Sequence, residues 1–286
     1  MGYDQQTYRR QKIGDSLRMF REGLGLTQRA ACRLLDRSQA SLSAYENGHR
    51  AIRPRDLKHI LDVYGVTDDL VRSRLLSLAA QGRQDGWWHD FEERLEPGVV
   101  DFASLEADAS SVRSFAPQVV HGLVQSDGYA RAVIGGSGTA LRRTREEIET
   151  DIRFRLNRQK IHDLACPPQI VIVLGEAALR QCMGGRLVMR DQLLKLLEMQ
   201  ERPHIELQVL PFVVQRHPGL DGAFTIMGVG SEGSLEVVTV HSMARTWYVD
   251  EPSDVDHYGR TFDLLREVAL PETDSRAMIE EIVSEL

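Results

Sequence analysis

Four amide, hydroxyl or methyl side chains share one face of a short predicted helix, where they can contact the edges of DNA bases. In the run QASLSAYE at residues 39–46, Gln39, Ala40, Ser43 and Ala44 are spaced i, i+1, i+4 and i+5. This spacing puts them on one side of an α-helix. Gln39 can pair with N6 and N7 of adenine, Ala40 and Ala44 can pack on thymine methyl groups, and Ser43 can donate or accept. The pattern predicts base reading in the major groove.

Contacts to DNA phosphates must come from outside this face, because it has no arginine or lysine. Such contacts supply much of the affinity of DNA-binding proteins. The candidates nearby are basic, amide or hydroxyl side chains: Gln28, Arg29, Arg37, Ser41, Asn47, Arg50 and Arg53. We expect about half of them to contact phosphates, and the others to be solvated surface groups.

Short helices must position these residues. Apolar side chains recur with helical spacing from residue 13 to 20, and Thr27 and Ser38 are typical N-caps for helices over 28–35 and 39–46. Asn47-Gly48 is expected to end the second of these, and Pro54 to begin another helix. The side chains expected to face the core are Ala30, Ala31, Leu34, Leu35, Leu42 and Tyr45. Two helices separated by a tight turn form a helix-turn-helix.

Residues 13–66 resemble the Xre-type, or lambda-repressor/Cro-like, DNA-binding domain. The resemblance lies in the Leu-Thr-Gln helix start, the Ser-x-x-x-Leu-Ser third helix and the closing Glu-Asn-Gly. It implies that the third helix enters the major groove by its N-terminal end, and that a homodimer binds the two half-sites of a palindromic operator in double-stranded DNA. The alternative is a helical bundle that contacts only proteins.

Charge is divided unevenly along the chain. Residues 1–66 hold 12 Lys and Arg against 7 Asp and Glu, whereas the remainder holds 23 against 35. A basic N-terminal part on an acidic body indicates that only the former meets a polyanion. The length of 286 residues predicts about two domains. We expect a helix-turn-helix domain over 1–80, a boundary segment with a Trp pair over 81–98 and a C-terminal domain over 99–286.

Several classes of protein are disfavoured. No apolar run approaches the roughly 20 residues of a membrane helix, and the polar N-terminus has no signal core. Cys32, Cys166 and Cys182 lie far apart and show no metal-ligand spacing. No common catalytic motif is present. We therefore expect a cytoplasmic protein that is not an enzyme and has no metal, cofactor or membrane contact.

The pattern beyond the boundary segment mixes helices and strands. Apolar residues at 102, 105, 109, 112 and 116 predict one helical stripe, and a long helix is expected from about 141 to 164. β-branched or alternating runs predict strands at 169–175, 205–211, 222–230 and 235–242. Two helices close the chain, the last one capped by Asp274 or Ser275. The expected class is α+β: an all-α five-helix helix-turn-helix domain, then a mixed domain with a small sheet.

A second resemblance spans nearly all of residues 85–286. The markers are GWW (86–88), LEADASSVRSF (105–115), HGLVQSDGYARA (121–132), RQ (158–159), GEAALRQCMGG (175–185), RDQLLKLLEM (190–199), IELQVLPF (205–212) and GAFTIMG (222–228). In this order they resemble the C-terminal region of actinomycete Xre-family regulators of the WhiJ kind. The resemblance implies a body that senses a ligand or binds a small partner protein. His121 and His241 depart from that pattern, where proline and an acidic residue are usual.

Eight side chains of the body are candidates for a ligand or partner site: Trp87, Trp88, His121, Tyr129, Arg131, Glu176, His217 and His241. Each also has an ordinary structural interpretation. The Trp pair can clamp one domain to the next, Glu176 can favour the start of the following helix, and the loop at 213–222 can be a simple connection. The predicted function is a dimeric repressor that responds to a ligand or partner protein. The alternatives are an antitoxin-like regulator and, less favoured, an enzyme tethered to DNA.

Overall fold

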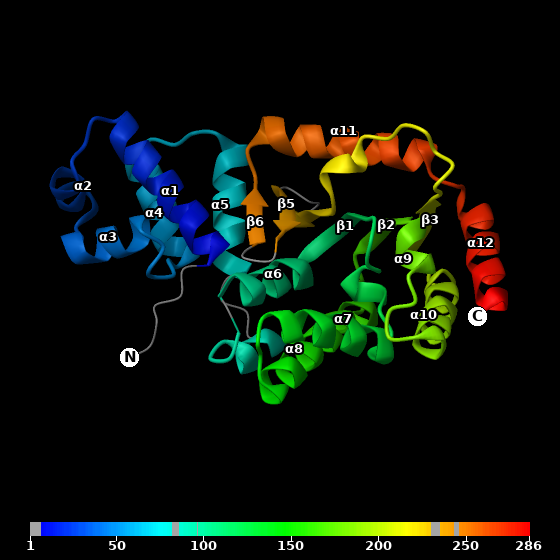
Figure 1. The fold of residues 1–286 in the computed structure, drawn as a ribbon. Coiled ribbons are helices and arrows are strands. Elements are labelled where there is room, and N and C mark those ends of the chain that lie inside the picture. The colour runs from blue at the N-terminus through cyan, green and yellow to red at the C-terminus, as the bar shows by residue number, and fades with distance from the viewer. Residues whose placement is uncertain (1–6, 82–85, 96, 230–234, 243–245) are drawn as a thin grey trace.

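A computed structural model describes residues 7–81, 86–95, 97–229, 235–242 and 246–286. We call residues 7–81 the head and the described residues from 86 onward the body; the head lies at one end of the molecule (Figure 1). The head is helical and the body combines helices with one sheet, which confirms the expected α+β class. None of the helices within the described ranges combines the length and the hydropathy that a membrane span requires.

Five helices form the head: α1 (Tyr8–Gly23), α2 (Gln28–Leu35), α3 (Gln39–Glu46), α4 (Pro54–Val63) and α5 (Asp69–Gln81). Their bounds follow local signals, because Thr27 and Ser38 cap α2 and α3 and Pro54 is the first residue of α4. Leu17, Leu42 and Leu57 are fully buried between them. The expectation that Leu34 faces inward is wrong: its side chain is 57% exposed, because the inner face of the two-turn helix α2 presents neighbouring residues instead.

Six strands form the sheet of the body: β1 (Ala109–Ala116), β2 (Gln169–Gly175), β3 (Ile205–Leu210), β4 (Phe224–Val229), β5 (Leu235–His241) and β6 (Thr246–Val249). Their order is β3-β2-β1-β4-β5-β6. The pairs β3–β2 and β2–β1 are parallel, whereas β1–β4, β4–β5 and β5–β6 are antiparallel. The sheet is therefore mixed, with β1 at the point where parallel pairing changes to antiparallel.

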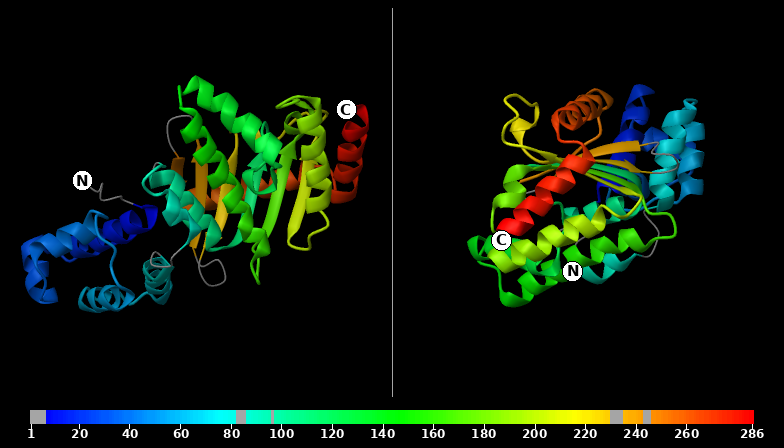
Figure 2. Two further views of the ribbon diagram at one scale, coloured as in Figure 1. Left: turned by 90° about the horizontal axis from the view of Figure 1, so that it is seen from below. Right: turned by 90° about the vertical axis from the view of Figure 1, so that its right-hand side faces the viewer.

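Helices cover both faces of this sheet (Figure 2). The remaining elements are α6 (Pro97–Ala107), α7 (Asp127–Ala140), α8 (Arg145–Arg158), α9 (Glu176–Arg180), α10 (Arg186–Met199), α11 (Pro252–Val268) and α12 (Glu272–Glu285), with 3-10 turns at Trp87–Phe91, Gly122–Val124, Gln159–Asp163 and Gly219–Asp221. Helices α6, α7, α10 and α12 pack on one face, and α11 packs on the other. The first of these cores is continuous with the core of the head.

Three expectations for the body are wrong. The expected helical stripe at 102–116 is the end of α6 followed by strand β1, because pairing with β2 and β4 overrides a spacing that also suits a helix. The expected helix at 141–164 is shorter: α8 begins at the capping box of Thr144 and gives way to a 3-10 turn after Arg158. Ser275 does not cap α12, which begins at Glu272; its buried hydroxyl instead accepts a hydrogen bond from the Val209 N–H at 2.9 Å.

The first turn of α1 joins the head to the body. The backbone N–H of Tyr8 donates to the carboxylate of Asp101, and its ring stacks on Tyr248 with centroids 5.0 Å apart. Arg9 reaches α6, where it donates to Ser104 Oγ at 2.9 Å and pairs with Asp108 at 2.7 Å. These contacts include buried charges, so they fix the head against the body rather than leave it on a free tether.

Candidate nucleic-acid interface

A tight turn sets α3 against α2. The Thr27 hydroxyl accepts from the Ala30 N–H at 3.2 Å, and the Ser38 hydroxyl accepts from the Ser41 N–H at 3.2 Å, so each helix begins with a side-chain cap. Between the helices Asp36 adopts a left-handed conformation with φ of 50°. Aspartate tolerates this region better than most residues, which allows the chain to reverse within three residues.

The inner side of α3 is anchored by apolar and charged groups. Leu42 and Tyr45 are buried, as expected. The buried carboxylate of Glu46 accepts from Arg21 Nε at 2.7 Å and from Gln28 Nε2 at 2.9 Å. The hydrogen bonds that Arg21 donates to Glu46 raise the pKa of Arg21, so its guanidinium stays charged. This network joins α1, α2 and α3. It also engages the Gln28 amide, which was predicted to contact a phosphate, in a hydrogen bond within the head.

The outer side of α3 carries the four residues predicted to read bases. Gln39 and Ala40 are exposed, and Ser43 and Ala44 are half-buried. The Ser43 hydroxyl accepts from Asn47 Nδ2 at 3.1 Å, which leaves its own proton available to donate. The first turn of α3 is thus the most accessible part of the face, and its amide and methyl groups have the chemistry that base edges require.

The residues predicted to contact phosphates fall into two groups. Arg29, Arg50 and Arg53 are exposed. The others are already engaged or partly covered: Arg37 pairs with Asp56 at 2.7 Å, Asn47 accepts from Arg18 at 2.7 Å, Gln28 donates to Glu46, and Ser41 is half-buried. The three exposed arginines therefore have the greatest freedom to meet a phosphate.

Arg18 of α1 contacts the C-terminal end of α3, although no motif in the sequence points to this residue. Its Nη2 donates to the Glu46 carbonyl oxygen at 3.0 Å and to Asn47 Oδ1 at 2.7 Å, at the C-terminal end of α3. A cation suits that end of a helix. The sequence shows Arg18 only as a polar residue on α1, because the contact depends on how α1 crosses α3.

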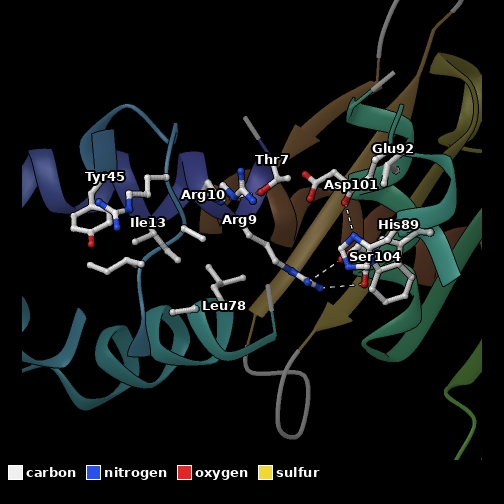
Figure 3. Close-up of a pocket in the computed structure, with 16 residues that line it drawn as sticks. Thr7, Arg9, Arg10, Ile13, Tyr45, Leu78, His89, Glu92, Asp101 and Ser104 are labelled. Atoms are coloured by element: carbon white, nitrogen blue, oxygen red, sulfur yellow. Dashed lines mark hydrogen bonds and ion pairs between the residues drawn. The ribbon is translucent and has the colours of Figure 1, made fainter. Parts of the chain in front are cut away.

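The Trp pair packs within the body. Trp87 lies 5.1 Å from Phe154 of α8 and 6.0 Å from Phe91, centroid to centroid. Trp88 is buried in the same cluster with Phe91 and Val100. Both rings thus pack on residues of the body, and Trp88 also borders the pocket between the body and the head (Figure 3).

Four other candidates of the body lie apart from one another. Tyr129 is buried, and its hydroxyl accepts from the Val120 N–H at 3.2 Å. Arg131 forms surface pairs with Asp127 and Glu149. Glu176 accepts from the Phe212 N–H at 2.8 Å and pairs with Arg180, and His217 accepts from the Gly219 N–H at 3.2 Å. Each has a local structural partner, and the structure does not gather them into one site.

His121 and His241, far apart in sequence, lie beside the same two arginines. Arg158 lies over the Phe102 ring at 4.7 Å, and His241 packs edge-on against that ring at 5.0 Å. Burial, then the charges of Arg158 and Arg155, lower the pKa of His121 well below its usual value and the pKa of His241 to about 4. Both imidazoles are therefore neutral at pH 7, so the positive charge of this cluster resides on the arginines.

No group of three His, Cys, Asp or Glu side chains in the described ranges has an arrangement that can hold a metal ion. Comparison with known families gives two matches. The model of a helix-turn-helix domain matches residues 12–73. The model of a domain of unknown function (DUF5753) matches residues 99–281. Searches among curated proteins and solved structures gave no match. Because the second family model covers more than half of the chain, the protein belongs to the DUF5753 family and carries a helix-turn-helix domain at its N-terminal end.

Proposed function

We propose that the protein is a sequence-specific transcriptional regulator that inserts the first turn of α3 into the major groove of DNA. One observation carries this proposal: Gln39 and Ala40 are exposed at the N-terminal end of α3, while Leu42 and Tyr45 anchor its other side. A recognition helix needs this arrangement, with a rigid inner face and free polar or methyl groups outside. The amide of Gln39 favours adenine, and the methyl of Ala40 favours a neighbouring thymine.

Arg29, Arg50 and Arg53 are the proposed phosphate contacts. They are exposed and flank the base-reading face at the starts of α2 and α4 and in the loop after α3. Their charge acts on any sequence, so they supply affinity and position α3 without choosing bases. Gln28, Arg37, Ser41 and Asn47 are secondary candidates, because their side chains already have partners or are partly covered.

The proposed active form is a homodimer on a palindromic operator, since one such domain covers only a half-site. We place the dimer contact on the segment between β3 and β4, where Val213 and Leu220 are 82% and 83% exposed and Phe212 is also exposed. This segment contacts α11, because Gly219 lies against Leu265 (Figure 1). Exposed apolar side chains gathered in one segment are typical of association surfaces.

The dimer contact is tested by sedimentation velocity on Leu220→Asp, with Leu187→Asp as the matched control on α10. Leu187 is 79% exposed, so both variants place a carboxylate at an exposed leucine. We expect Leu220→Asp to shift the protein to monomers and Leu187→Asp to leave the dimer intact. Dimers of equal strength in both variants would contradict the assignment.

We propose that the regulator represses by occupying promoter DNA, and that its body responds to a ligand or to a protein partner, as expected of the WhiJ kind. The fixed contact between head and body supports such a response, because a change in the body is transmitted to α1 directly. An antitoxin-like regulator is the alternative. It predicts a small protein that copurifies with the body in a fixed stoichiometry from native cells.

DNA binding is tested by selecting duplexes from a random library with the full chain and measuring their affinities. Ala40→Glu places a carboxylate on the exposed face of α3 without touching the core. Ala277→Glu, on an exposed position of α12, is the matched control. We expect Ala40→Glu to abolish enrichment and the control to retain the wild-type consensus. The same consensus from both variants would refute the proposed interface.

A further inference from the structure

One half-buried arginine of the body has a free pair of donors. Arg155 of α8 donates from Nη1 to the neutral amide of Gln125 at 3.1 Å, and within the described ranges its Nε and Nη2 have no acceptor. In those ranges, the buried side-chain nitrogens that lack a partner belong to Arg9 and Arg37. The free donors of Arg155 are therefore not sealed from solvent, and a ligand can reach them.

The carboxylates around Arg155 already have partners. The two oxygens of Glu106 accept from Nε and Nη2 of Arg158, each at 2.7 Å. Asp151, the other carboxylate whose charge acts on Arg155, is paired with Arg143. The cluster of Arg155, Arg158 and Glu106 therefore holds one surplus positive charge. Burial, then the charge of Arg158, lower the pKa of Arg155 to about 10, so its guanidinium is still charged at pH 7.

Further donors lie beside the free edge of Arg155. Gly122 brings the two arginines together, because a methyl group at this position would lie 3.0 Å from Arg155 Cδ and 3.1 Å from Arg158 Nη1. His121 precedes Gly122 and is half-buried, and its Nδ1 accepts from the Leu123 N–H at 3.4 Å. Because the lowered pKa of His121 keeps its ring neutral, the proton lies on Nε2, which is a donor.

The acceptors of segment 120–125 are already engaged. The carbonyl oxygens of Gly122 and Gln125 accept from Gln159 Nε2 at 3.1 and 2.7 Å. The Val120 carbonyl oxygen accepts from Gln125 Nε2 at 2.7 Å, and the Gln125 amide oxygen accepts from Arg155. Donors and positive charge thus remain without partners on this segment and the adjoining arginine, and this combination selects an anion.

We propose that the cluster binds the carboxylate of a small organic anion, which lies against the free Nε and Nη2 of Arg155 and accepts a third hydrogen bond from Nε2 of His121. The same edge of Arg158 already holds the planar carboxylate of Glu106 in this way. Such two-donor contacts to a carboxylate are charge-assisted and among the strongest hydrogen bonds of proteins. A monocarboxylate also cancels the single surplus charge, whereas a cation would meet like charge.

Helix α6 lies between this site and the docked head. Its residues Phe102 and Glu106 contact Arg158, while Asp101 and Ser104 of the same helix hold α1. A small carboxylate is therefore the class of ligand that we assign to the response of the body. This regulatory role rests on the proposed function, whereas the binding of a carboxylate does not.

Binding is tested by ligand-observed NMR titration of the full chain with acetate, and with acetamide as its uncharged counterpart, in a phosphate-free buffer. We expect acetate to bind at least about tenfold more tightly, because only acetate forms charge-assisted bonds. Arg155→Gln removes the free edge, and Arg153→Gln, at an exposed arginine of α8, is the matched control with the same change in net charge. Acetate affinity should fall to that of acetamide in the first variant and stay at the wild-type value in the second.

Arg155→Lys keeps the charge but lacks the two-donor edge, so its acetate affinity should lie between those of the wild type and Arg155→Gln. Equal affinities of acetate and acetamide for the wild type, no binding of acetate, or equal acetate affinities in Arg155→Gln and Arg153→Gln would each overturn the site. Inorganic phosphate that binds more tightly than acetate would overturn the assignment of a carboxylate. Circular-dichroism melting curves establish that each variant is folded, and the comparison of acetate with acetamide needs no variant.

The regulatory role is tested by measuring the affinity for a selected duplex in saturating acetate and in the same concentration of chloride. We expect the two affinities of the wild type to differ at least about fivefold, the lower end of common allosteric effects, and those of Arg155→Gln to agree. Equal affinities in the wild type would overturn the regulatory role. If the chain selects no duplex, the proposed function fails, whereas the acetate titrations still decide the site.

Discussion

The head and the body each bury an arginine–glutamate pair, but the surroundings of the two pairs differ. In the head, Arg21 and Glu46 are joined at 2.7 Å, and Arg21 also pairs with Glu22 at 3.1 Å. In the body, Arg158 and Glu106 are joined at 2.7 Å, and both side chains are at most 9% exposed. The carboxylates outnumber the arginine in the head, whereas a second arginine lies beside the pair in the body.

That second arginine, Arg155, has no ion-pair partner in the described part of the body. Its Nη1 donates to the neutral amide of Gln125 at 3.1 Å. Burial, then the charge of Arg158, lower the pKa of Arg155 to about 10. The buried pair of the head is therefore balanced in charge, and Glu22 adds a second carboxylate at its exposed edge. The body holds a surplus positive charge that depends on Glu106.

The largest predicted effect comes from Glu106→Gln. It leaves Arg158 and Arg155 without a carboxylate at ion-pair distance, and we expect it to lower the free energy of unfolding by about 5 kcal/mol, the upper end for broken buried pairs. Glu46→Gln should lower the free energy of unfolding by about 3 kcal/mol, because Arg21 still forms its ion pair with Glu22. Urea denaturation followed by circular dichroism measures both.

Adding Arg155→Gln to the Glu106→Gln variant tests whether the second arginine destabilises the body. The second change removes the surplus cation, so we expect it to restore about 1–3 kcal/mol. A double variant less stable than Glu106→Gln alone, or a larger loss from Glu46→Gln, would contradict the charge imbalance.

The next effect concerns Asp101, which holds the head on the body. Burial raises its pKa to about 6, against hydrogen bonding from Tyr8 and the charge of Arg9, which lower it. The folded state then binds this proton more tightly than the unfolded state, whose pKa is about 4. The contribution of Asp101 to the free energy of unfolding is fully present below pH 4 and is lost as the pH rises through 6.

This pH dependence is measured as the difference in unfolding free energy between the wild type and Asp101→Asn. Relative to the variant, the wild type should lose up to about 3 kcal/mol between pH 4 and pH 7. A difference that stays constant, or that grows with pH, would show that the docking carboxyl is not buried in this way.

The smallest effect, of opposite sign, belongs to His241 of the body. The pKa of His241 is about 4 in the folded state, below its value in the unfolded state. Its contribution to the free energy of unfolding is therefore present above about pH 6.5 and is lost as the pH falls toward 4. The ring packs against Phe102, but the residue as a whole is exposed, and solvent screening reduces the effect to about 1 kcal/mol. Compared with His241→Asn, the wild type should lose this amount of stability from pH 7 to pH 4. If the wild type loses no stability, the charges of Arg155 and Arg158 do not act on His241 in this way.

The head could be predicted well because its signals are local. Thr27 and Ser38 cap the helices that they precede, and Leu42 and Tyr45 lie on the buried face that helical spacing assigns to them. The central strand β1 could not be predicted in this way. Its partners β2 and β4 lie far along the chain, and their hydrogen bonds decide the conformation of a segment whose spacing also suits a helix.

The same distinction applies to the sites. The proposed base-reading face follows from residue order on one short helix, so the exposure of Gln39 and Ala40 could be predicted from spacing alone. The contacts of Arg9 with Ser104 and Asp108, and the packing of His241 on Phe102, join segments that lie far apart in the sequence. These contacts arise from tertiary packing, which a single sequence does not contain.

Gln39→Ala is the sharpest test of whether the outer face of α3 reads DNA bases. Its affinity is measured on the best selected duplex and on all single-base variants of that duplex, with the exposed Gln118→Ala of the body as the matched control. We predict a loss of about 1–3 kcal/mol and relaxed choice at one adenine position for Gln39→Ala, and no change for the control. Unchanged affinity and base preference in Gln39→Ala would contradict the account.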